Sequence, residues 1–154
     1  SGCNQSYRKN KMANFKFDEN FRRYSLKEDV DLSYRIFKKN PGSLIMTPNA
    51  KLIHKATDVA RMPEKTVRCM EYVHSFYLFS KNMDPNLIRS IQFYWAWGGE
   101  LLVVSPFIIL INFLRGSKEG YLYLKYGFKA FTFCLRNLKK LKKGDLSFFY
   151  KDIE

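Results

Sequence analysis

An almost continuously apolar segment, Ile91–Leu114 (IQFYWAWGGELLVVSPFIILINFL), constrains the fold more than any other part of the chain. A helix of about 20 such residues crosses a hydrocarbon core about 30 Å thick. Tyr94, Trp95 and Trp97 gather at one end, as aromatic side chains do at a membrane interface. Because a carboxylate is costly in lipid, we expect Glu100 to face protein or water. A buried helix of a soluble domain is the alternative, but so small a domain offers little to bury it, and we favour the membrane.

The chain after this segment is aromatic and basic. Tyr121–Leu135 carries Lys125 and Lys129, and it predicts an interfacial amphipathic helix or a re-entrant segment whose lysines reach the headgroups. Arg136–Lys143 then forms a basic cluster, in which each charge near an anionic leaflet contributes about 1 kcal/mol. The positive-inside rule places this cluster in the cytoplasm. The sequence leaves open whether Ile91–Leu114 spans the membrane or re-enters.

The composition predicts an anionic partner. The 154 residues carry a formal net charge of +13, which favours a phosphate-bearing substrate, an acidic membrane surface or nucleic acid. Aromatic residues make up 17% of the chain, and they lie mostly inside apolar runs, so we expect lipid contact and no nucleic-acid partner. Cys3, Cys69 and Cys134 have no metal-binding spacing, which predicts ordinary buried or half-buried thiols in a reducing compartment.

Two helices are expected before the apolar segment. Ser25, with Glu28 three residues later, has the spacing of a capping box, and Asn40-Pro41-Gly42 ends the helix that this box would start. A second helix is expected from Pro63 to about Ser80, with His74 as a packing or surface residue.

Three carboxylates, those of Glu28, Asp29 and Asp31, fall in the first turn of the first expected helix. The positive end of the helix dipole stabilises such groups by about 0.3–1 kcal/mol each. They are either ordinary helix-start residues or they include a general base, which would need an acceptor hydroxyl within hydrogen-bond reach.

Short apolar segments at Ser43–Met46 and Pro48–Ile53 predict two strands, and His54 follows the second. A histidine at a strand end is either a surface or packed residue or a ligand that reaches a site at the sheet edge. The turn at Asn82–Asn86 is the expected domain boundary.

Four short motifs stand in order near the start of the chain: SGCNQSYRK (Ser1–Lys9), FDENF (Phe17–Phe21), EDVDLSYRI (Glu28–Ile36) and PNAKLIH (Pro48–His54). At this spacing they resemble the C-terminal half of a family 2 glycosyltransferase of the rhamnosyltransferase-like type, which has the GT-A fold. The resemblance covers roughly residues 1–82. It implies an α/β fold class, in which residues 1–82 are the acceptor half of a Rossmann-like GT-A domain and residues 83–154 are a mostly α-helical, membrane-associated tail.

The resemblance also implies a reaction, the inverting transfer of a sugar from a nucleotide sugar to a hydroxyl of a glycan or lipid-linked acceptor. The catalytic part would face the cytoplasm. Asp29 would be the general base, and Glu28 would orient the site or the acceptor. His54 would help to hold a divalent metal, Mn²⁺ or Mg²⁺, at the nucleotide diphosphate.

Further positions carry weaker expectations. Gly2, Asn4 and Asp31 are assigned to the acceptor side, although the first two also fit a plain turn. Arg8 is either a solvated charge or a diphosphate contact. Arg35 contacts the diphosphate or forms an ion pair with Asp31 one helical turn away, and we favour the ion pair.

The donor-binding half of such an enzyme, with its metal-binding D-x-D, has no counterpart here. Asp29-Val30-Asp31 has that spelling, but its position is that of the acceptor-side motif. We therefore expect a piece of a longer enzyme or a remnant, without transferase activity on its own. The alternative is a non-catalytic basic protein that docks on membranes.

Overall fold

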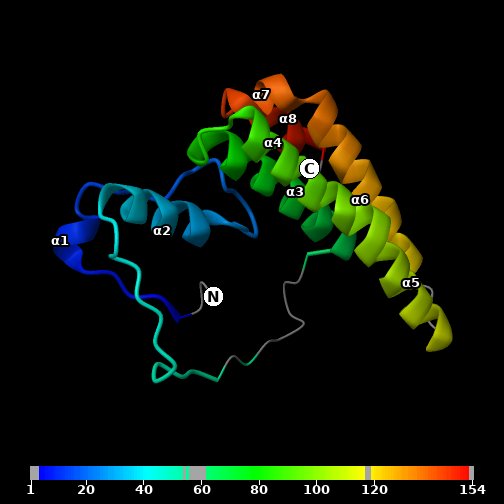
Figure 1. Ribbon diagram of the computed structural model, residues 1–154, viewed down its shortest axis with the longest axis horizontal. Helices are drawn as coiled ribbons and strands as arrows, with labels where there is room; N and C mark the ends of the chain where they lie inside the picture. Colours follow the sequence, from blue (N-terminus) through cyan, green and yellow to red (C-terminus); the bar gives the residue numbers. More distant parts are fainter. Residues whose placement is uncertain (1–3, 54, 56–61, 117–118, 153–154) are drawn as a thin grey trace. The chain divides into compact units, whose positions relative to one another are not determined.

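The computed structural model of the chain describes residues 4–53, 55, 62–116 and 119–152 (Figure 1). The chain divides into two compact units, an N-terminal unit, Ser1–Arg61, and a C-terminal unit, Met62–Glu154. The expected boundary after Asn82 instead lies between two helices of the C-terminal unit.

The α/β expectation is wrong. The structure is 66% helical, and no strand occurs among the residues that it describes. The backbone–backbone hydrogen bonds of Ser43–Met46 and Pro48–Ile53 form local turns, such as the bonds from Ser43 N–H to Asn40 O (3.1 Å) and from Lys51 N–H to Asn49 O (3.1 Å). An apolar run becomes a strand only when a neighbouring strand completes its hydrogen bonds, and this part of the N-terminal unit offers none.

The N-terminal unit contains two helices, α1 (Lys9–Met12) and α2 (Glu28–Lys39). As predicted, α2 ends before Asn40, whose N–H bonds to Ile36 O at 2.9 Å, and Gly42 turns the chain with a φ of +79°. The predicted cap at Ser25 is wrong. Lys27 occupies the N-cap position, while the Ser25 hydroxyl donates to Phe21 O at 3.0 Å and so closes the preceding loop.

The C-terminal unit is helical throughout its described part. Its elements are α3 (Glu64–Asn82), α4 (Leu87–Gly99), the π-helix η2 (Glu100–Val104), α5 (Ser105–Leu114), α6 (Glu119–Arg136), α7 (Leu138–Lys142) and α8 (Ser147–Asp152). The helix α3 begins directly after Pro63, as predicted. The elements α4, η2 and α5 form one continuous helix of 28 residues, Leu87–Leu114, which we call the long helix (Figure 1).

Helix α3 forms the core of the C-terminal unit, and its residues 72–79 are all buried. On one side its rings pack on α4, where Phe79 stacks on Phe93 with ring centroids 4.1 Å apart. On another side His74 Nε2 lies 2.8 Å from the Tyr150 hydroxyl of α8. The prediction that His74 is a packing or surface residue is therefore confirmed.

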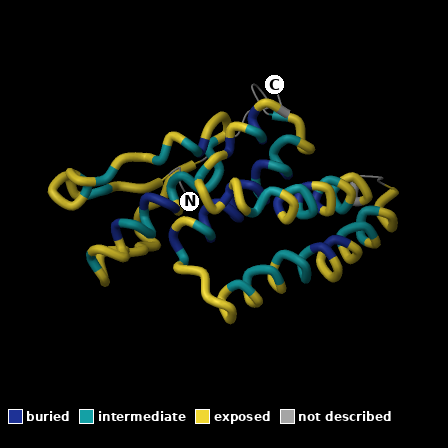
Figure 2. The backbone as a smooth tube through the Cα atoms, turned by 90° about the horizontal axis from the view of Figure 1, so that it is seen from above, coloured by how far each residue is buried: buried dark blue, intermediate teal, exposed yellow. Residues whose placement is uncertain are grey.

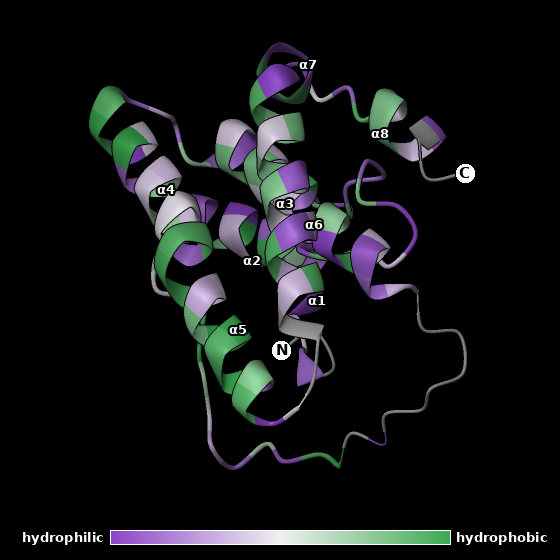
Figure 3. Cartoon of the chain, turned by 90° about the vertical axis from the view of Figure 1, so that its right-hand side faces the viewer, coloured by the Kyte–Doolittle hydropathy of each residue, from purple (hydrophilic) through white to green (hydrophobic). Residues whose placement is uncertain are grey.

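The outer side of the long helix is exposed in both of its halves, whereas Trp97–Leu101 between them are half-buried or buried (Figure 2). Its α5 portion is the most uniformly apolar part of the C-terminal unit (Figure 3). The helices α3 and α6 lie against its other side.

Candidate functional site

The first turn of α2 is the candidate catalytic site, and a strained loop positions it. Arg23, Ser25 and Lys27 all have left-handed backbone conformations, with φ of 62°, 48° and 74°. Each such residue other than glycine costs about 1–2 kcal/mol. Strain of this kind clusters where surrounding structure holds a functional segment in one geometry.

Asp31 has a structural role in this turn. Its side chain is fully buried, and its Oδ2 accepts a hydrogen bond from Arg35 Nε at 2.8 Å and forms an ion pair with Arg35 Nη2 at 2.7 Å. Arg35 Nη2 also donates to Lys16 O at 2.7 Å. The favoured ion pair is thus present, and it engages both Asp31, expected on the acceptor side, and Arg35, expected at the diphosphate.

Asp29 and Glu28 are placed differently from Asp31. Both are half-buried, and neither has an ion-pair partner within the part of the chain that the structure describes. Asp29 Oδ1 accepts only the adjacent N–H of Val30, at 2.9 Å. A carboxylate held at a helix N-terminus without a cationic partner is able to accept a proton from a bound hydroxyl.

Hydrogen bonds connect three of the four motifs directly. The Tyr7 hydroxyl lies 3.2 Å from Ser33 Oγ, which joins the first motif to the third. Asn4 Nδ2 donates to Ala50 O at 2.8 Å, which joins the first to the fourth. The bond from Arg35 to Lys16 O ties the third motif to the residue that precedes the second. The folded chain therefore brings these separated motifs together.

The remaining expected residues have less defined positions. Arg8 is exposed at the N-cap position of α1. Gly2 and His54 lie outside the described residues. Elsewhere in the described chain, no group of three or more histidine, cysteine, aspartate or glutamate side chains is arranged to hold a metal ion. The divalent metal therefore stays a prediction.

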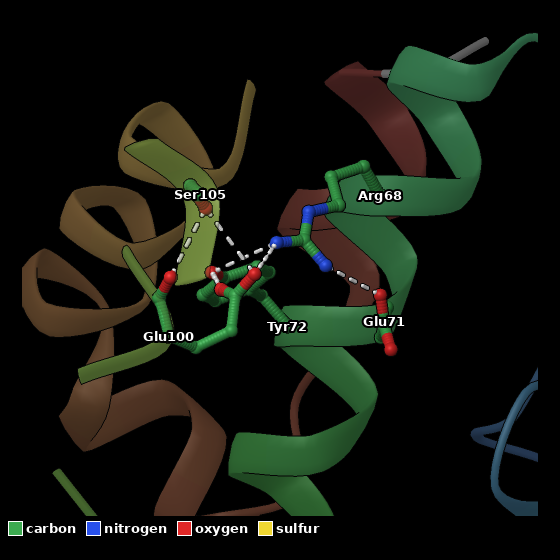
Figure 4. A network of polar contacts seen from close by, with 5 residues as sticks. All are labelled: Arg68, Glu71, Tyr72, Glu100 and Ser105. Atoms are coloured by element: carbon green, nitrogen blue, oxygen red, sulfur yellow. Dashed lines mark hydrogen bonds and ion pairs between the residues drawn. The ribbon is translucent and has the colours of Figure 1, made fainter. Parts of the chain in front are cut away.

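A second polar cluster lies in the C-terminal unit and centres on Arg68 of α3 (Figure 4). Arg68 Nη1 donates to Glu71 Oε2 at 2.9 Å, and Nη2 forms an ion pair with Glu100 Oε1. The Tyr72 hydroxyl donates to Glu100 Oε2. Ser105 Oγ donates to Glu100 O at 3.1 Å. The expectation that Glu100 faces protein or water is confirmed.

Close packing surrounds this cluster. The Arg68 guanidinium lies 3.8 Å from the centre of the Tyr123 ring, and only 5% of Arg68 is exposed. Burial and the hydrogen bond to Glu100 raise the pKa of Tyr72, so the phenol stays protonated and donates. A Cβ on Gly127 of α6 would lie 2.8 Å from Leu101 Cδ2 and 3.2 Å from the Tyr72 hydroxyl, so glycine permits this approach.

Sequence reasoning missed Arg68 and Tyr72 as the partners of Glu100. The only local signal is that a charged residue and a tyrosine lie one turn apart on one helix. The π-helical turn at Glu100–Val104 was also not foreseen. Such turns often occur at functional positions.

The long helix meets the length and composition required to cross a membrane, and only 11% of its most apolar window is buried. This supports the membrane expectation in its coarse form and says nothing of orientation. The thiols of Cys69 and Cys134 are free, half-buried and buried respectively, as predicted.

Comparisons with models of known protein families, with curated proteins and with solved structures found no match to this chain. The glycosyltransferase resemblance therefore rests on the four motifs alone.

Proposed function

We propose that this chain is the acceptor-side part of an inverting glycosyltransferase that works at a membrane, with Asp29 as the general base. The observation that supports this most is the set of hydrogen bonds that gathers the motifs, Tyr7 to Ser33 and Asn4 to Ala50. Three of the four motifs, which are separated in the sequence, are joined by these bonds, as residues of one acceptor site would be.

The carboxylates of α2 have different roles in this proposal. Asp31 is neutralised by Arg35 and fixes the helix, whereas Asp29 has only a backbone partner. Asp29 takes the proton of the acceptor hydroxyl while that oxygen attacks the anomeric carbon of the donor sugar. The bond from the anomeric carbon to the diphosphate breaks, and the nucleoside diphosphate leaves with the electron pair. Glu28 beside Asp29 orients the acceptor.

The other predicted residues take the roles that the family resemblance gives them. In that resemblance Asn4 and Gly2 belong to the acceptor side, and Arg8, which is exposed, belongs to the diphosphate side. A divalent cation near His54 would neutralise the leaving diphosphate. The donor is a nucleotide sugar, and the exposed long helix favours an acceptor that is carried on a lipid.

Replacement of Asp29 tests the assignment. In the native protein, expressed in its own membranes and supplied with a panel of radiolabelled nucleotide sugars, Asp29→Asn should lower transfer by about 10²- to 10⁴-fold, because the acceptor hydroxyl loses its base. Asp145→Asn is the matched control, since Asp145 is an exposed carboxylate of the C-terminal unit. Transfer by Asp29→Asn at close to the wild-type rate would remove Asp29 as the base.

A non-catalytic membrane-docking protein is the second candidate function. The exposed apolar side of the long helix favours it, because membrane binding requires no catalytic residue. In that case the native protein transfers no sugar from any donor in the panel, while it still binds membranes.

A further inference from the structure

The exposed side of the long helix is an apolar strip that occupies both halves of the helix, with the half-buried Gly98 and Gly99 between Trp95 and Leu102. Its members recur from the first turn to the last, and all are exposed: Ile88, Ile91, Trp95, Leu102, Phe107, Leu110 and Phe113. At 1.5 Å per residue, the 28 residues give the long helix a length of about 42 Å. Side chains three, four and seven residues apart share one face of a helix, so this is a surface helix with one apolar side.

Charged groups lie beside the middle of this helix, on its covered side. Glu100 is near its centre and is paired with Arg68, which also contacts Glu71. Within one turn of Arg68, Glu64 and Lys65 are exposed on α3.

Helix α6 adds two more charges at the same level. Gly127 lies against Leu101, and Lys125 and Lys129, on either side of that glycine, are exposed. If the long helix stood upright across a bilayer, all these charges would lie near the hydrocarbon centre, where they are costly. A helix that lies in the membrane plane leaves them at the headgroups or in water.

The charges around the strip match an anionic surface. Arg89 near its start and Arg115 just past its end are exposed, as are Lys125 and Lys129 of the adjacent helix α6. Glu100, on the covered side, is the only acidic residue in the sequence from Leu87 to Leu114. Interfacial helices combine an apolar face with flanking lysines and arginines in this way.

We propose that the C-terminal unit docks on anionic bilayers with the long helix lying in the plane of the interface, its apolar strip against the acyl chains and its ion pair facing the protein. This docking rests on the C-terminal unit alone and does not depend on the transferase proposal. Asp29→Asn is therefore expected to bind membranes like the wild-type chain.

The depth of the helix in the bilayer tests the proposal. Spin labels are attached to the full chain at Ile88, Leu102 or Phe113, with the native cysteines replaced, on vesicles of phosphatidylcholine and phosphatidylglycerol. A helix in the plane gives one shallow depth at all three positions. A helix that crosses the bilayer gives a depth that is greatest at Leu102, and that result would overturn the proposal. A label at the exposed Lys143 serves as the water-facing reference.

Vesicle flotation tests the strip and the lipid. Ile91→Glu and Leu102→Glu should each weaken binding by about tenfold or more, because a charge enters the apolar face. Met46→Glu, at an exposed apolar position of the N-terminal unit, should leave binding unchanged. Binding should fall when phosphatidylglycerol is omitted and when salt is raised.

Two results would contradict this surface assignment. One is equal binding to neutral and anionic vesicles. The other is a soluble dimer that fails to bind vesicles and that Ile91→Glu dissociates, which would mean that a second copy covers the strip.

Discussion

Different kinds of contact stabilise the interior of each of the two units. Among the described residues of the N-terminal unit, the buried apolar side chains are Phe21, Leu32 and Ile36, and polar bonds such as those of Asp31 join its segments. The C-terminal unit packs aromatic rings around α3 and buries most of that helix. Because apolar burial supplies most of the folding free energy, we expect the N-terminal unit to open locally far more often than the C-terminal unit.

The largest effect is expected from the aromatic core. Phe76 is 1% exposed, and its ring contacts those of Phe93, Tyr94, Trp97 and Phe131. Phe76→Ala should lower the free energy of unfolding of the C-terminal unit by about 4 kcal/mol, because it leaves a cavity. Urea unfolding in detergent micelles measures this. Phe128→Ala, at an exposed ring of α6, is the control and should change the free energy of unfolding little. If Phe76→Ala lost no more stability than this control, Phe76 would not be a core residue.

A smaller loss is expected from the buried ion pair. Arg68→Ala removes the cation that compensates Glu100 and should cost about 3 kcal/mol in the same assay. Combining Arg68→Met with Glu100→Gln should restore much of this stability, because no unpaired charge is left. Lys65→Ala, one turn away and exposed, should change little. If Arg68→Ala unfolds at the wild-type urea concentration, the pair does not stabilise the unit.

The smallest loss in the free energy of unfolding is expected from the ion pair of the N-terminal unit, and it distinguishes the two units most clearly. Arg35→Ala removes the guanidinium that pairs with the buried Asp31 and should cost about 2 kcal/mol, confined to the N-terminal unit. Hydrogen exchange should then become faster at the amides of α2 and stay slow at Tyr72–Phe79. Lys16→Ala keeps the backbone carbonyl that Arg35 contacts and should leave exchange unchanged. Faster exchange at the amides of both units would contradict the expectation that this ion pair stabilises only the N-terminal unit.

The features that were predicted correctly from the sequence depend on residues that lie close together in the chain. The end of α2 at Asn40, the start of α3 after Pro63 and the long apolar helix follow from residues close together in the chain. The ion pair of Asp31 with Arg35 was also foreseen, because it joins residues one helical turn apart.

The failures involve partners that are distant in the sequence. Ser43–Met46 was predicted as a strand, but a strand needs a second strand to bond with, and the apolar pattern does not supply one. Ser25 was predicted as a cap, but its hydroxyl bonds back to Phe21. Arg68 was missed because it is 32 residues from Glu100 in the chain. At the candidate site, the strained backbone before α2 could not be predicted either, since no glycine marks it.

The π-helical turn has a consequence for how this chain can vary. In it, Ser105 N–H bonds to Glu100 O, five residues back, so the turn holds one residue more than an α-helix would. If the same residues were wound as a plain α-helix, without the wider turn, everything beyond Val104 would be rotated by about 100° around the helix axis. Phe107 would then leave the side of the helix that Ile88 and Trp95 occupy. The extra residue therefore keeps the two halves of the apolar strip on one side of the long helix, while Glu100 points the other way.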